Sequence, residues 1–126
     1  MMPFTSLRGL SEKETGEWPF NSPEKLLKLV KAGTHGEYYY EPVDSVPVNF
    51  LSTLDSTGGN SGSPTLNGKA ELVGLLFDGI FESVIGDWDF DDNLNRTIHV
   101  DSRYMLWVME HVDGAHNLLE EMAIVK

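Results

Sequence analysis

A serine bracketed by glycines has the clearest chemical potential in this sequence, because residues 58–64 read GGNSGSP with Ser61 at the centre. A nucleophilic hydroxyl must point into a cleft while backbone N–H groups converge on the oxygen that becomes negative when a carbonyl is attacked. Glycines permit that backbone shape. The pattern predicts Ser61 as the nucleophile of a hydrolase, with the N–H groups of Gly59 and Ser61 as its oxyanion hole.

Glycine, asparagine and serine also form ordinary turns and flexible linkers, so the surrounding elements decide between these interpretations. Residues 63–66 can begin a strand, Asn67-Gly68 is a strong hairpin signal, and residues 70–77 (AELVGLLF) form an apolar strand. A flexible linker would not be embedded in this way. The order of nucleophile turn, strand, hairpin and strand is that found around the serine of chymotrypsin-like proteases.

The resemblance extends over nearly the whole chain. The segments that carry it are 46–53 (VPVNFLST), 58–69 (GGNSGSPTLNGK), 71–79 (ELVGLLFDG), 97–109 (TIHVDSRYMLWVM), 112–115 (VDGA) and 117–122 (NLLEEM). Together they resemble the S46 dipeptidyl-peptidase family of bacterial serine exopeptidases. The resemblance implies a hydrolase that releases dipeptides from peptide N-termini, and this chain is similar to the C-terminal end of such enzymes.

The fold implied by the resemblance is mainly β with flanking helices. We expect part of the second six-stranded barrel of a chymotrypsin-like double β-barrel, ending in a C-terminal helix. The chain would be a single domain with an irregular segment and a helix over residues 1–45, barrel strands with the nucleophile turn over 46–101, and helices over 102–126. Two complete barrels need about 200 residues, so 126 residues allow only one of them.

The base of a catalytic triad is the missing component. In the S46 family the His and Asp precede the Ser and lie upstream of anything in this sequence, so the resemblance implies that the isolated chain is inactive. A base within the chain remains an alternative, and its candidates are His35, His99, His111 and His116. Without a base, a serine hydroxyl is a weak nucleophile.

Gly79 is a candidate substrate-binding residue. It stands 18 residues beyond Ser61, where the resemblance places the pocket for the residue before the scissile bond. Family members that prefer Asp or Glu carry an Arg there, which would pair with a substrate carboxylate. Glycine implies an open, uncharged pocket and hence dipeptides whose second residue is apolar or bulky. An ordinary Asp-Gly turn at Asp78-Gly79 is compatible with that role.

Helix signals flank the predicted strands. Residues 23–32 begin with a Ser22 cap and Pro23 at the first helical position, and Gly33 ends them. Residues 102–112 and 115–122 carry apolar stripes separated by Asp113-Gly114. A short strand is expected around residues 4–7. The tyrosines at 38–40 suggest packing across a barrel flank in preference to a binding platform.

Charge and composition limit the kinds of partner that the chain is expected to bind. A net charge of −11 disfavours nucleic acid and anionic membranes, and no membrane span is visible. No cofactor is expected: there are no cysteines and no zinc motif, and the acidic residues 87–96 lack the glycine and glutamate of a calcium loop. We interpret residues 87–96 as a solvated loop. The resemblance implies a periplasmic or cell-surface parent enzyme.

The expected partners are a peptide substrate, the upstream part of the peptidase, and alternatively a second copy of the chain. Two further functional classes stay open at this point. One is a non-catalytic interaction or dimerisation module that covers its exposed barrel edges with a partner. The other is a small serine hydrolase whose base is supplied within an oligomer.

Overall fold

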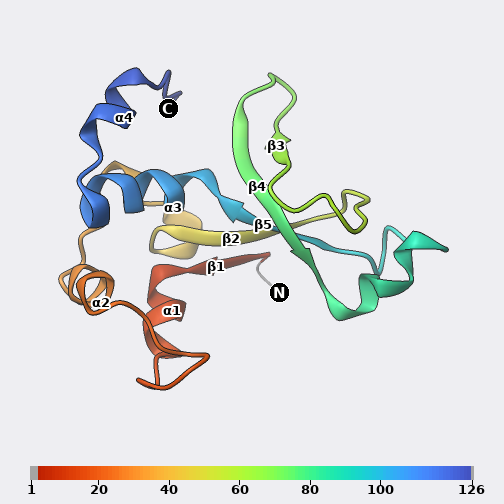
Figure 1. The fold of residues 1–126 in the computed structure, drawn as a ribbon, viewed down its shortest axis with the longest axis horizontal. Coiled ribbons are helices and arrows are strands. Elements are labelled where there is room, and N and C mark those ends of the chain that lie inside the picture. The colour runs from red at the N-terminus through yellow and green to blue at the C-terminus, as the bar shows by residue number, and fades with distance from the viewer. Residues whose placement is uncertain (1–2, 126) are drawn as a thin grey trace. The chain divides into compact units, whose positions relative to one another are not determined.

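The computed structural model describes residues 3–125, and the chain divides into two compact units. Of the described residues, 3–4 and 49–102 form one unit, and 5–48 and 103–125 form the other. The strands form a five-stranded sheet in the order β1-β2-β5-β4-β3 (Figure 1). Their bounds are β1 Phe4–Ser6, β2 Pro47–Ser52, β3 Pro64–Leu66, β4 Leu72–Gly79 and β5 Thr97–Asp101.

Strand β5 lies between β2 and β4 and pairs antiparallel with both. Its alternate residues Thr97, His99 and Asp101 are buried, whereas Ile98 and Val100 are half-buried. This two-residue period is that of a strand with two different faces. The more buried face of β5 is therefore polar, and its side chains need hydrogen-bond partners inside the fold.

The β3–β4 hairpin confirms the predicted pair of strands, but its turn differs from an Asn-Gly turn. The left-handed residue is Ala70, with φ 62°, and Gly68 has no positive φ. The cause is the Asn67 side chain, whose Oδ1 accepts from the N–H groups of Lys69 and Glu71. This local bonding extends the turn, so β4 begins at Leu72 instead of Ala70.

The segment after β4 is a 3₁₀ helix, η3 (Phe81–Asp87), followed by the acidic loop. Several of its apolar side chains are exposed, among them Phe81, Val84, Ile85 and Trp88. The buried Asn95 accepts from the Asp91 N–H at 3.0 Å, which closes the loop on itself. The carboxylates of residues 87–92 are exposed, as predicted for a solvated loop.

The second unit has a helical core. Its helices are α1 (Leu7–Glu12), α2 (Glu24–Lys31), α3 (Ser102–Trp107) and α4 (His116–Glu121). Leu7, Leu26, Val46, Val48 and Trp107 form the buried cluster. The Trp107 Nε1–H donates to the Thr34 carbonyl oxygen at 2.7 Å, so the indole is buried with its polar group satisfied.

The three predicted helices are present, with one error at a terminus. Helix α2 begins at Glu24 with Pro23 at the cap position, and no side chain caps it, so the predicted Ser22 cap is wrong. Proline there fixes the backbone in an extended conformation one residue later than expected. Helix α3 continues into a π-helical segment, η4 (Val108–Asp113), which ends at Gly114 with φ 67°. No helix within residues 3–125 has the length and hydropathy to cross a membrane.

Candidate active site

Ser61 lies in the loop between β2 and β3, in a turn stabilised by its own residues. The Thr57 N–H donates to Asn60 Oδ1 at 2.9 Å, and the Asn60 N–H donates to the Thr57 carbonyl at 3.2 Å. Gly59 and Gly62 have φ angles of 97° and 87°. Side chains other than glycine rarely adopt such angles, so both glycines are required by the turn.

Two backbone hydrogen bonds attach this turn to strand β4. The Gly62 N–H donates to the Leu76 carbonyl at 2.7 Å, and the Leu76 N–H donates to the Ser63 carbonyl at 2.9 Å. Ser61 itself is exposed, and its Oγ donates to the Phe77 carbonyl at 3.4 Å. The turn is therefore held on a strand while its hydroxyl stays accessible, as the chemistry of a nucleophile requires.

The backbone donors beside Ser61 are available. Within residues 3–125, the N–H groups of Gly59 and Ser61 donate no hydrogen bond. Exposed N–H groups without an internal acceptor are what an oxyanion hole presents to a developing negative charge. This geometry agrees with the predicted role of both residues, which stays a prediction.

His99, the one histidine in the unit of Ser61, is not its base. Its Nε2 is 2.6 Å from Ser52 Oγ, and its Nδ1 is 2.7 Å from Thr65 Oγ1. The ring is fully buried, and burial lowers the pKa of the imidazole below its ordinary value of 6.5. Both nitrogens are occupied, so this interior network replaces the catalytic role that the sequence left open for His99.

Gly79 is the last residue of β4, and Asp78 Oδ1 accepts its N–H at 2.8 Å. A Cβ atom at Gly79 would lie 3.6 Å from Ser83 Cβ and 3.7 Å from the Arg96 carbonyl oxygen, which are ordinary contacts. The site therefore tolerates a side chain. Its predicted role in binding substrate stays a prediction.

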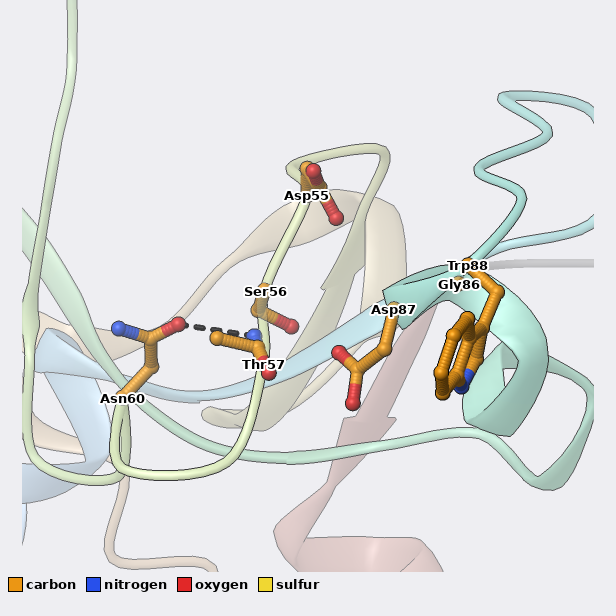
Figure 2. Close-up of a pocket in the computed structure, with 7 residues that line it drawn as sticks. All are labelled: Asp55, Ser56, Thr57, Asn60, Gly86, Asp87 and Trp88. Atoms are coloured by element: carbon orange, nitrogen blue, oxygen red, sulfur yellow. Dashed lines mark hydrogen bonds between the residues drawn. The ribbon is translucent and has the colours of Figure 1, made fainter.

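A hollow of about 580 Å³ lies beside the nucleophile turn. Figure 2 shows the Asp87 carboxylate directed toward the loop that carries Ser56 and Thr57, with Asn60 on the same loop. Asp55, Gly86 and the exposed Trp88 complete the lining. Two carboxylates give this hollow a negative potential. Residues 3–125 contain no group of three or more acidic or imidazole side chains arranged to hold a metal ion.

Comparison with known proteins places this geometry in a family. The Peptidase S46 profile matches residues 1–124. The chain belongs to the Peptidase S46 family. Among S46 relatives, dipeptidyl-peptidase 7 of Phocaeicola vulgatus is 47% identical over 98% of this chain and 17% of its own length. An Asp/Glu-specific dipeptidyl-peptidase of Shewanella putrefaciens is 44% identical over 98% of this chain and 20% of its own length.

A solved S46 structure matches as well. The crystal structure of Porphyromonas endodontalis DPP11 in complex with the dipeptide Arg-Asp has a TM-score of 0.91 at 37% identity, over 96% of this chain and 17% of that one. The predicted antiparallel fold with flanking helices, as part of a chymotrypsin-like double barrel, is thereby confirmed. The chain spans about a fifth of the length of its S46 relatives.

Sequence reasoning did not find the hydroxyl partners of His99 in this S46 chain. Ser52 and Thr65 are separated from His99 by 47 and 34 positions, so no local pattern connects them. The available signal was the alternation of Thr97, His99 and Asp101 along a predicted strand, which places three polar side chains on one face.

Proposed function

We propose that this chain is the nucleophile-bearing part of an S46 serine peptidase that releases dipeptides from peptide N-termini. The observation that carries the proposal is the turn at residues 58–64, which is bonded to strand β4 and presents an exposed Ser61 beside two unoccupied backbone donors. The S46 relatives named as dipeptidyl-peptidases support the same reaction. Ser61 attacks the peptide carbonyl, and the N–H groups of Gly59 and Ser61 stabilise the oxyanion.

The general base belongs to the upstream part of the peptidase. The histidine in the unit of Ser61 is engaged with Ser52 and Thr65, and the Ser61 hydroxyl bonds to a carbonyl oxygen that accepts no proton at neutral pH. A serine without a base is a poor nucleophile. The isolated chain is therefore inactive, and the upstream polypeptide is its partner.

The exposed apolar side chains of η3 and of Trp88, which follows it, support a partner of that kind. Phe81 and Trp88 are 87% and 89% exposed, and Val84 is 73% exposed. Large apolar patches in a soluble protein usually mark an interface. The match covers only 17% of the length of the Phocaeicola vulgatus relative, so the rest of such an enzyme supplies the polypeptide that covers them.

The second residue of the released dipeptide is apolar or bulky. Gly79 offers no cation to an acidic side chain, and Asp55 and Asp87 make the hollow beside the nucleophile turn negative. A carboxylate-bearing substrate would meet repulsion without compensation. We also place the parent enzyme in the periplasm or at the cell surface, on the family resemblance.

A chimeric enzyme tests the proposal. Residues 1–124 replace the matching segment of the Phocaeicola vulgatus dipeptidyl-peptidase 7, and release of dipeptides from unblocked chromogenic peptides is measured. The chimera is expected to turn over, while Ser61→Ala in the same chimera loses at least about 1,000-fold in kcat. A folded chimera that is inactive contradicts the proposal. Activity of the isolated chain that Ser61→Ala abolishes would instead show a base within this chain or its oligomer.

A further inference from the structure

The loop that carries Ser61 is long and has two anchored ends. It leaves β2 after Ser52 and joins β3 at Pro64. Inside the loop, Thr97 Oγ1 donates to the Leu54 carbonyl at 2.7 Å and lies 2.8 Å from Ser56 Oγ, and Gly62 and Ser63 bond to the Leu76 backbone. A loop of this length closes at an entropic cost, so each contact that fixes its flanks adds to the order of the residues between them. The position of Ser61 therefore depends on what holds Ser52 and the start of β3, in addition to these interior contacts.

One side chain contacts both ends. The imidazole of His99 on β5 lies 2.6 Å from Ser52 Oγ through Nε2 and 2.7 Å from Thr65 Oγ1 through Nδ1. His99 is fully buried, and Thr65 is 7% exposed. In that environment an unmade hydrogen bond is costly, so both contacts are strongly favoured. Each hydroxyl both donates and accepts, which allows the pair to complement a neutral imidazole.

The ring of His99 is itself immobilised. Phe50, its partner across β2 and β5, stacks on it with centroids 4.7 Å apart and planes 14° from parallel. On the other side His99 pairs with Leu76 of β4, whose backbone bonds to Gly62 and Ser63. The imidazole thus sits at a fixed position beneath the strand to which the nucleophile turn is attached.

We propose that His99 is a positioning residue that closes the nucleophile loop, with one ring nitrogen on the last residue of β2 and the other on the second residue of β3. The proposal rests on Ser61 being the nucleophile, as argued above, but its structural content does not depend on activity. Because the two ring nitrogens contact opposite ends of the loop, loss of either contact affects mainly the end that it holds. Nδ1 governs the Gly62–Ser63 end, and Nε2 governs the Leu54 end, where Ser52 Oγ accepts the Leu54 N–H at 3.3 Å.

Amide hydrogen exchange of the ¹⁵N-labelled chain, read by NMR, tests the two sides separately. Thr65→Val removes the Nδ1 contact without changing the side-chain shape, and Thr65→Ser is its matched control because it keeps the hydroxyl. His99→Asn retains a polar atom near Nδ1 only, and His99→Gln retains one near Nε2 only. The amides of strand β5 serve as the internal reference for global stability.

The expected result is selective. Thr65→Val and His99→Gln raise the exchange rates of the Gly62 and Ser63 amides about tenfold relative to β5, the effect of one lost hydrogen bond. Thr65→Ser and His99→Asn leave those two amides within about twofold, while His99→Asn accelerates the Leu54 amide. The wild-type imidazole shows a slowly exchanging ring N–H.

Three results would each overturn the proposal. In the first, Thr65→Ser raises the exchange rates of the Gly62 and Ser63 amides as much as Thr65→Val does, which would assign the effect to packing. In the second, the β5 amides accelerate equally, which would make His99 a general stability residue. In the third, no loop amide changes. None of these outcomes bears on whether the chimeric enzyme described above releases dipeptides, so the two proposals fail separately.

Discussion

Gly74 lies against the ring of Phe50, and the ring occupies the space that a side chain at position 74 would fill. A Cβ atom at Gly74 would lie 2.7 Å from Phe50 Cε1 and 2.5 Å from the Val100 carbonyl oxygen on the neighbouring strand. Both distances are shorter than any normal carbon contact. The absence of a side chain at Gly74 is what allows Phe50 to reach across to His99.

Gly74→Ala is therefore expected to destabilise the chain by roughly 2–3 kcal/mol, because overpacking at a backbone contact forces a strand to shift. Urea unfolding followed by circular dichroism measures it. Gly58→Ala is the control, since a Cβ there meets nothing within 4 Å and its φ is not positive. Trimming the ring with Phe50→Leu in the Gly74→Ala background should restore little, because the clash with Val100 remains. Full restoration would show that the ring contact alone was at fault.

Gly59 gives a second backbone prediction. Its φ of 97° with open space around it means that Gly59→Ala is strained by conformation and not by contact. We expect a loss of about 1–2 kcal/mol if the turn keeps its shape. Relaxation of the turn would instead spare stability and displace the N–H groups beside Ser61. Comparing the unfolding free energy with the amide shifts of Asn60 and Ser61 separates the two, and an unchanged value of both would contradict the strained turn.

Burial of His99 predicts a pH dependence of stability. Because the folded pKa lies below the ordinary 6.5, the unfolded chain binds a proton that the folded chain rejects in the window between the two values. The contribution of His99 to the free energy of unfolding is therefore complete above pH 6.5, and it decreases as the pH drops from 6.5 toward the lowered pKa. The difference between wild type and His99→Gln, measured in urea from pH 7.5 to pH 4.5, isolates this contribution. A difference that does not vary with pH would contradict a neutral, buried ring.

Gly79→Arg should change the substrate preference of the chimeric enzyme. The Cβ position is free of clashes, so the guanidinium can extend from the end of β4 and pair with a substrate carboxylate. We expect kcat/KM for dipeptides ending in Asp or Glu to rise at least tenfold relative to those ending in Leu. Gly79→Ala is the control for filling the space without charge. An unchanged preference would remove Gly79 from the substrate pocket.

The core of the helical unit supplies a fifth prediction. Trp107→Phe removes the donor to the Thr34 carbonyl and part of a fully buried ring, and we expect a loss of roughly 3 kcal/mol. Trp18→Phe is the control, because that indole is 87% exposed. Thermal unfolding measures both, and equal effects of the two substitutions would contradict the assigned core.

Local sequence signals predicted the parts of the fold that depend on neighbouring residues. The glycines around Ser61, the hairpin at Asn67 and the apolar stripes of the helices each act within a few positions, and all three gave elements that the structure contains. The errors were also local. Pro23 displaced the cap from Ser22, and the Asn67 side chain moved the left-handed residue to Ala70.

The interior of the sheet could not be predicted in this way. The partners of His99 come from β2 and β3, and strand register decides which side chains meet. Periodicity indicates that Thr97, His99 and Asp101 share a face of β5, but not that this polar face is the buried one or that Phe50 lies over Gly74. The residue types around Ser61 were enough to predict the candidate site. The contacts that support it join distant parts of the chain, so only the structure shows them.

Trp88 is the single tryptophan of the unit that carries Ser61, and it borders the hollow beside Asn60. Its indole is 89% exposed, so its fluorescence reports directly on the water around it. The other two tryptophans, Trp18 and Trp107, lie in the second unit. Trp18→Phe removes the second exposed indole, and Trp107 is retained because it is buried in the core. The protein thus contains an intrinsic fluorescent probe beside its nucleophile loop. A polypeptide that covers the indole will shift its emission to shorter wavelength, which can be measured without any added label.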